Sequence, residues 1–135
     1  MMSPTVRAGL LTVLAGALIG FVILGIGGRL AMHAIARISR GTGAFTPGGT
    51  ASVIGLGAVA GAVAGLILFA ARTLLWRWPP LPALLFWAAI FAGTLVHLDL
   101  RDPLELALFL PVGVAFGALL QAASWRWRRG WPAAG

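Results

Sequence analysis

The segment 57–65 reads Gly-Ala-Val-Ala-Gly-Ala-Val-Ala-Gly, with a glycine at every fourth position and only alanine and valine between them. Residues four apart lie on the same face of an α-helix, so the three glycines form one face without side chains. In lipid, apolar helices associate by such close backbone packing, because the surrounding acyl chains are as apolar as leucine. The segment therefore predicts a membrane helix that packs through its glycines, either within a bundle or against a second copy of the chain. The same spacing recurs in two other apolar stretches, at Gly16, Gly20, Gly113 and Gly117.

The composition of the whole chain places it among membrane proteins. Of its 135 residues 60% are hydrophobic and 10% are charged, and its mean hydropathy is +0.98. Soluble domains carry about 25% charged residues, and disordered chains are poor in apolar ones, so both classes are excluded. The chain has no cysteine, which excludes disulfides and thiolate chemistry.

Four apolar stretches approach the length of about 20 residues that a helix needs to cross a bilayer. They cover residues 8–28, 51–71, 81–98 and 106–125. We therefore expect an all-α fold, a single transmembrane domain over residues 1–135 in which four helices form a compact bundle. A cleaved signal peptide is the alternative for the first stretch. This stretch is longer than the apolar region of about 7–15 residues in a signal peptide, so we expect it to be retained.

The distribution of positive charge predicts the orientation. All ten basic residues are arginines, and the formal net charge is +7. With four spans, the N-terminus, the connection after the second span and the C-terminus share one side, which carries six of the arginines. Cytoplasmic loops carry the excess of positive residues, so we expect a multi-pass protein of the inner (plasma) membrane with both termini in the cytoplasm.

A basic stripe follows the first span. Arg29, His33, Arg37 and Arg40 are spaced by four, four and three residues, which places them on one helix face. Residues 29–40 are expected either to extend the first helix or to lie on the membrane surface as an amphipathic helix. We expect the stripe to bind anionic lipid headgroups, and a functional buried charge is the alternative.

All three acids, Asp99, Asp102 and Glu105, are predicted on the same side of the membrane as this stripe. We expect at least one ion pair, between Arg29 or Arg37 and Asp102 or Glu105. Imidazole and carboxylate groups are also ligands for zinc, but the residues on this side do not have the spacing of a known metal site. We therefore predict no metal and no cofactor. Interleaved apolar runs leave no basic groove, so we expect no nucleic-acid partner.

The connection between the first two spans, residues 41–50, is rich in glycine and threonine and contains a proline. Its last residue, Thr50, is predicted to cap the second helix. The alternative is that the backbone amides of this segment, together with Thr46 or Thr50, hold an anion at the positive end of the helix dipole.

Two motifs carry a resemblance. The run Gly27-Gly28-Arg29-Leu30-Ala31-Met32, followed by Phe45-Thr46-Pro47-Gly48-Gly49-Thr50 and the glycine-rich helix, resembles a set of uncharacterised small bacterial four-span membrane proteins over about the first half of the chain. The resemblance implies a four-helix membrane fold and no activity. The same glycine, arginine and Gly-Thr positions are more weakly similar to small four-span fluoride channels. The chain lacks the asparagine of their second helix and the tight phenylalanine and hydroxyl motif of their third.

These observations lead to two functional hypotheses. The first is a non-enzymatic packing or accessory subunit that forms a homo-oligomer or binds another membrane protein. The alternative is a small anion channel or anion-binding transporter formed by an oligomer. A pore needs polar residues at bilayer depth, and Thr12, Ser52, Thr94 and Gln121 are nearly all that the chain offers. An enzyme would need a nucleophile or metal with its base, and no such pair is visible.

Overall fold

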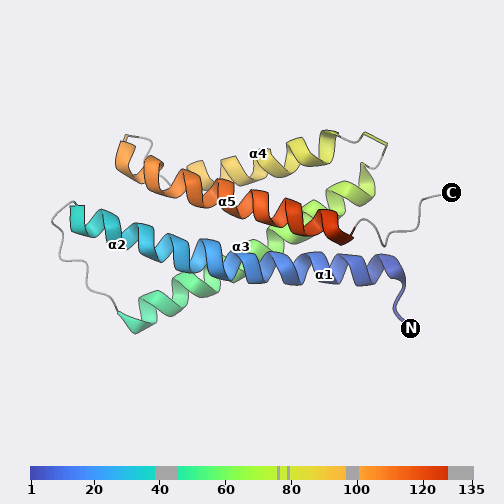
Figure 1. Cartoon of the computed structure of the whole chain (residues 1–135), viewed down its shortest axis with the longest axis horizontal. Helices are drawn as coiled ribbons and strands as arrows, with labels where there is room; N and C mark the ends of the chain where they lie inside the picture. Colours follow the sequence, from blue (N-terminus) through green and yellow to red (C-terminus); the bar gives the residue numbers. More distant parts are fainter. Residues whose placement is uncertain (39–45, 76, 79, 97–100, 128–135) are drawn as a thin grey trace.

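The computed structural model describes residues 1–38, 46–75, 77–78, 80–96 and 101–127. Over these residues the chain is all-helical, as predicted, and contains no strand. The elements in order are α1 (Pro4–Ile19), a π-helical segment η1 (Gly20–Gly27), α2 (Gly28–Ile38), α3 (Pro47–Leu74), α4 (Pro80–Val96) and α5 (Pro103–Trp127). Figure 1 shows α1, η1 and α2 as one long helix that α3 crosses at an angle, with α4 and α5 lying alongside as a hairpin.

Four of the helices begin at a proline: Pro4, Pro47, Pro80 and Pro103. Proline suits the first helical position because its backbone has no N–H, and the N–H groups of the first turn have no partner inside the helix. The predicted bounds of the second and fourth spans rested on apolar length and did not use this signal. The second and fourth spans therefore begin three to four residues earlier than predicted.

The residues before three of these prolines are polar and cap the helix that follows. The Ser3 hydroxyl accepts a hydrogen bond from the Val6 N–H at 3.3 Å, and the Thr46 hydroxyl accepts one from the Gly49 N–H at 3.3 Å. Asp102 Oδ1 accepts from the Leu104 N–H at 2.9 Å.

The prediction that Thr50 caps the second helix is wrong. The cap is Thr46, because the helix already begins at Pro47. Thr50 lies inside the first turn of α3, where its hydroxyl donates to the Thr46 carbonyl oxygen at 3.1 Å.

The first helix does not turn at the glycine pair that precedes the basic stripe. Gly28 has φ −60° and ψ −39°, an ordinary helical conformation, and the helix runs without a break from Pro4 to Ile38. Of the two alternatives for residues 29–40, the described part, up to Ile38, is therefore an extension of the first helix. The segment η1 in its middle was not predicted.

Three helices are long and apolar enough to cross a membrane: Pro4–Ile38, α3 and α5. The predicted third span corresponds to α4, which is apolar but has only 17 residues. At about 1.5 Å per residue α4 is about 26 Å long, slightly less than a hydrocarbon core of about 30 Å.

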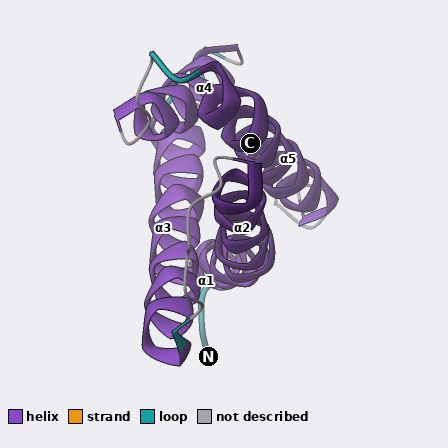
Figure 2. Cartoon of the chain, turned by 90° about the vertical axis from the view of Figure 1, so that its left-hand side faces the viewer, coloured by secondary structure: helices purple, strands orange, loops and turns teal. Residues whose placement is uncertain are grey.

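Figure 2 gives the arrangement in an end view: α4 and the long N-terminal helix lie on opposite sides, with α3 and α5 between them. A small core of fully buried side chains, Leu68, Phe86, Phe116 and Leu120, joins α3, α4 and α5. In Figure 1 the start of α1, the end of α3 and the end of α5 lie at the same end of the molecule.

Candidate functional site: a glycine seam and an apolar cavity

Glycines let the backbones of the long N-terminal helix and α3 lie in direct contact. A Cβ atom on Gly61 would clash with the backbone of Gly16 and Gly20, and a Cβ on either of those two would clash with the backbone of Gly61. All three residues are buried. No residue larger than glycine fits there unless the two backbones move apart, and we call this contact the glycine seam.

The seam extends about two helical turns around Gly61. A Cβ on Gly65 would lie 2.6 Å from the Thr12 carbonyl oxygen, and one on Gly57 would lie 2.6 Å from the Gly25 backbone nitrogen. Gly25 belongs to η1, so the π-helical segment is itself part of the seam. Each of these contacts is with backbone atoms, which cannot move aside as a flexible side chain can.

Gly113 and Gly117 of α5 have a different environment, because side chains of α4 rather than a backbone lie over them. A Cβ on Gly113 would lie 2.9 Å from Thr94 Oγ1, and one on Gly117 would lie 2.8 Å from the Trp87 ring. These glycines therefore make room for a hydroxyl and an indole. They share the four-residue spacing of the seam but not its backbone contact.

A polar network joins α3, α4 and α5 near the end of the molecule where α3 and α5 end. Arg72 Nη1 donates to the Ser124 hydroxyl at 2.7 Å, and this hydroxyl donates to the Gln121 carbonyl oxygen at 2.7 Å. Trp87 Nε1 donates to Gln121 Oε1 at 2.8 Å. Ser124 is only 4% exposed, so its hydrogen bonds are made away from solvent.

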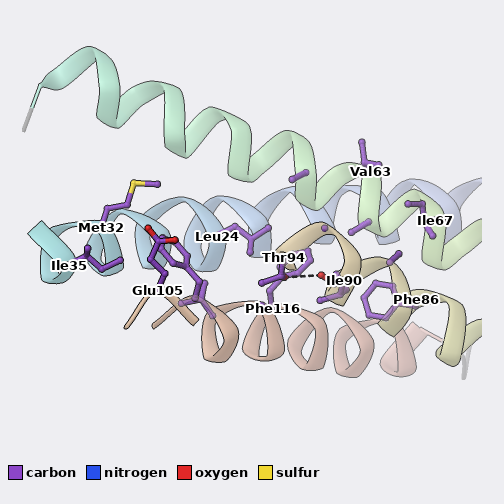
Figure 3. A pocket seen from close by; sticks show the side chains of 18 of the residues that line it. Leu24, Met32, Ile35, Val63, Ile67, Phe86, Ile90, Thr94, Glu105 and Phe116 are labelled. Atoms are coloured by element: carbon purple, nitrogen blue, oxygen red, sulfur yellow. Dashed lines mark hydrogen bonds between the residues drawn. The ribbon is translucent and has the colours of Figure 1, made fainter. Parts of the chain in front are cut away.

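An apolar cavity of about 740 Å³ lies between the long N-terminal helix, α3, α4 and α5. This is within the range of about 300–1,000 Å³ typical of small-molecule sites. Its walls are mostly aliphatic and aromatic, and Figure 3 shows Leu24, Met32, Val63, Ile90 and Phe116 among them.

Two polar side chains line this cavity. Thr94 donates its hydroxyl hydrogen to the Ile90 carbonyl oxygen of its own helix at 2.8 Å. Glu105 lies at the end near Met32 and Ile35, as Figure 3 shows, and it is the one charged residue among the described residues of the lining. The cavity is thus an apolar space with a carboxylate at one end.

The described part of the basic stripe lies outside this cavity. Arg29 is partly buried, and its Nη2 lies 3.9 Å from the position that a Cβ on Gly49 would take, beside the first turn of α3. His33 is partly buried and Arg37 is exposed. Arg40 lies outside the described residues.

The three acids predicted on the same side as this stripe lie at different places in the chain. Asp102 caps α5 and Glu105 lines the cavity, while Asp99 lies outside the described residues, as does His97. Within the described ranges no three His, Cys, Asp or Glu residues are grouped as metal ligands would be.

Neither the cavity nor the polar network was predicted from the sequence. Gln121 was noted only as a rare polar residue at bilayer depth, and Ser124 and Trp87 were not singled out. An indole N–H inside an apolar span needs a hydrogen-bond acceptor, and Gln121 is one of the few polar side chains in the predicted spans, so this pairing was an available signal. The cavity left no such signal, because its volume depends on how four helices cross.

Comparisons of this chain with protein-family models, with curated proteins and with solved structures find no match.

Proposed function

We propose that the chain is a four-span inner-membrane protein with both termini in the cytoplasm, and that it acts as a non-enzymatic packing or accessory subunit. In this proposal α4 is the short third span. The described basic stripe, at Arg29, His33 and Arg37, binds anionic lipid headgroups on the outer side. Its protein partner is a second copy of the chain or another membrane protein.

The glycine seam carries this proposal. A helix pair with no Cβ at Gly16, Gly20 and Gly61 gains direct backbone-to-backbone van der Waals contact along the seam, and such packing is a main source of helix association in lipid. Weak Cα–H···O contacts add to it at such close approach. The remaining surface of the long helix and α3 carries many exposed leucine, valine and phenylalanine side chains. This surface suits lipid or a partner helix.

The lining of the cavity favours this role over the anion channel. An anion path needs cations or N–H donors along it. The cavity offers aliphatic and aromatic walls with one carboxylate, and neither arginine nor histidine is among its described lining residues.

The seam is tested by Gly61→Leu, with Gly55→Leu as the matched control. Gly55 lies in the same helix, but a Cβ there would meet nothing within 4 Å. We expect Gly61→Leu to lower the free energy of unfolding in detergent by more than about 2 kcal/mol, because the clash is with backbone. Gly55→Leu is expected to leave stability unchanged or to raise it, since leucine favours helix more than glycine does.

Size-exclusion chromatography of the same variants with light scattering reports the oligomeric state. Equal stability of the two variants, with unchanged assembly, would contradict the proposal that this seam holds the bundle together. Loss of oligomers by Gly55→Leu alone would instead place the assembly surface on the exposed face of α3.

A further inference from the structure

We propose that the cavity binds one acyl chain of an amine-headed phospholipid, with the ammonium group of the lipid at Glu105. The inference rests on the proposed membrane embedding and assigns a ligand to the cavity. It is carried by the length of the cavity, its volume and the position of its single charge.

The length of the cavity matches one leaflet. Along α5 its lining extends from Glu105 to Phe116, about three helical turns or about 16 Å. The hydrocarbon core of a bilayer is about 30 Å thick, so one leaflet contributes about half of this. Glu105 lies in the first turn of α5, at one end of this membrane helix. An acyl chain that begins at this level would reach the middle of the membrane beside Phe116.

The volume of the cavity suits a single hydrocarbon chain better than a partner helix. A helix with its side chains is about 10–12 Å across, so one that followed the lining for about 16 Å would need more than about 1,200 Å³, against about 740 Å³ in the cavity. A single hydrocarbon chain is much narrower and fits a cavity of this size. The chain would make van der Waals contacts with side chains such as Leu24, Val63 and Phe109, and these side chains lack such contacts when the cavity is empty.

The charge at the end of the cavity selects the headgroup. The lining offers the carboxylate of Glu105, while the described arginines and His33 lie outside it. A carboxylate has about four lone-pair positions, so it can accept from a ligand's ammonium in addition to any protein donor. A phosphatidylglycerol headgroup offers no ammonium to this carboxylate. The geometry thus favours phosphatidylethanolamine over phosphatidylglycerol in this position.

Gly93 supplies a variant that fills the cavity without disturbing the fold. It lines the cavity from α4, and a Cβ there would meet nothing within 4 Å. Gly93→Phe therefore places an aromatic ring in the space that we propose for the acyl chain. Gly55→Phe is the matched control, because Gly55 is equally open and lies outside the cavity lining. Gly93→Ala adds too little volume to displace a chain.

The experiment uses the full chain, purified in mild detergent and exposed to equimolar phosphatidylethanolamine and phosphatidylglycerol. Native mass spectrometry counts the retained lipids. In parallel, a phosphatidylethanolamine with a photoreactive diazirine in its acyl chain is crosslinked, and the labelled peptides are identified. We expect one retained phosphatidylethanolamine and labels near Met32 and Phe109. Gly93→Phe should reduce labelling at least about 10-fold, and Gly55→Phe and Gly93→Ala should not.

Glu105→Gln tests the headgroup. It should lower the preference for phosphatidylethanolamine over phosphatidylglycerol about 10-fold, which is the size expected for one hydrogen bond to a charged group, while a lipid is still retained. The proposal would be overturned if the protein without substitutions retained phosphatidylglycerol in preference to phosphatidylethanolamine. Undiminished labelling of a folded Gly93→Phe variant would overturn it as well.

Failure of the proposed function is recognised separately. If carbonate washing releases the chain from membranes, the embedding itself is wrong. If the chain stays in the membrane but retains no lipid after purification, the lipid site alone is overturned.

Discussion

The buried hydroxyl of Ser124 joins α3 and α5. It accepts from the guanidinium of Arg72 in α3 and donates to the backbone of α5, and one turn earlier Gln121 accepts from Trp87 of α4. Arg72 ends the predicted second span, where an arginine usually extends to the headgroups. Here its side chain instead contacts α5.

We predict that Ser124→Ala destabilises the protein by about 1–2 kcal/mol, because Arg72 Nη1 loses the Ser124 hydroxyl as an acceptor in a place with little water. Thermal unfolding in detergent, followed by the loss of helical circular dichroism, measures this. Ser52→Ala is the control: the Ser52 hydroxyl is exposed and donates only within its own helix, to the Gly48 carbonyl oxygen. Equal unfolding temperatures for the two variants would show that the Arg72 hydrogen bond does not contribute.

At the scale of elements, the helices are largely predictable and their starts show why. Ser3-Pro4, Thr46-Pro47 and Asp102-Pro103 each combine a capping side chain with a proline at the first helical position. This pair of signals marks a helix start within one residue. The spans were predicted from uninterrupted apolar length alone, which is insensitive to the polar first turn. The η1 segment has no comparable signature, since its glycines are equally compatible with an α-helix.

The α4–α5 hairpin depends on the space that its glycines leave. We predict that Gly117→Ala lowers stability by about 1–3 kcal/mol, because its Cβ would lie 2.8 Å from the Trp87 ring. The ring has little freedom to move, since its N–H is held by Gln121.

Gly93→Ala is the matched control on the same hairpin. The added Cβ meets nothing within 4 Å, and alanine favours a helix more than glycine does. The stability of this variant should therefore be unchanged or higher by up to about 1 kcal/mol. Chemical unfolding of both variants in the same detergent checks the pair. A Gly117→Ala variant as stable as Gly93→Ala would mean that the indole does not pack against α5 as described.

At the scale of the whole molecule, composition was enough to predict an all-helical membrane protein. The spacing of Gly57, Gly61 and Gly65 indicated a face that another helix could approach, but the partner face could not be read from the sequence. In the structure it belongs to the first long helix, and the similar glycines of α5 face side chains instead. The cavity was beyond sequence reasoning, because it is lined by residues of the long helix, α3, α4 and α5 together, and its volume depends on how these helices cross.

The central claim is that all four apolar segments cross the membrane, the short α4 included. The chain has no cysteine, so single cysteines introduced at Met2, Gly48, Arg77 and Arg101 can be labelled in intact cells with a membrane-impermeant maleimide. Met2, Arg77 and Arg101 lie before or between the spans, and Gly48 lies in the first turn of α3. The account predicts that Gly48→Cys and Arg101→Cys are labelled from outside, and that Met2→Cys and Arg77→Cys are labelled only after the cells are opened. Labelling of Arg77→Cys and Arg101→Cys from the same side would contradict it, because α4 would then not cross.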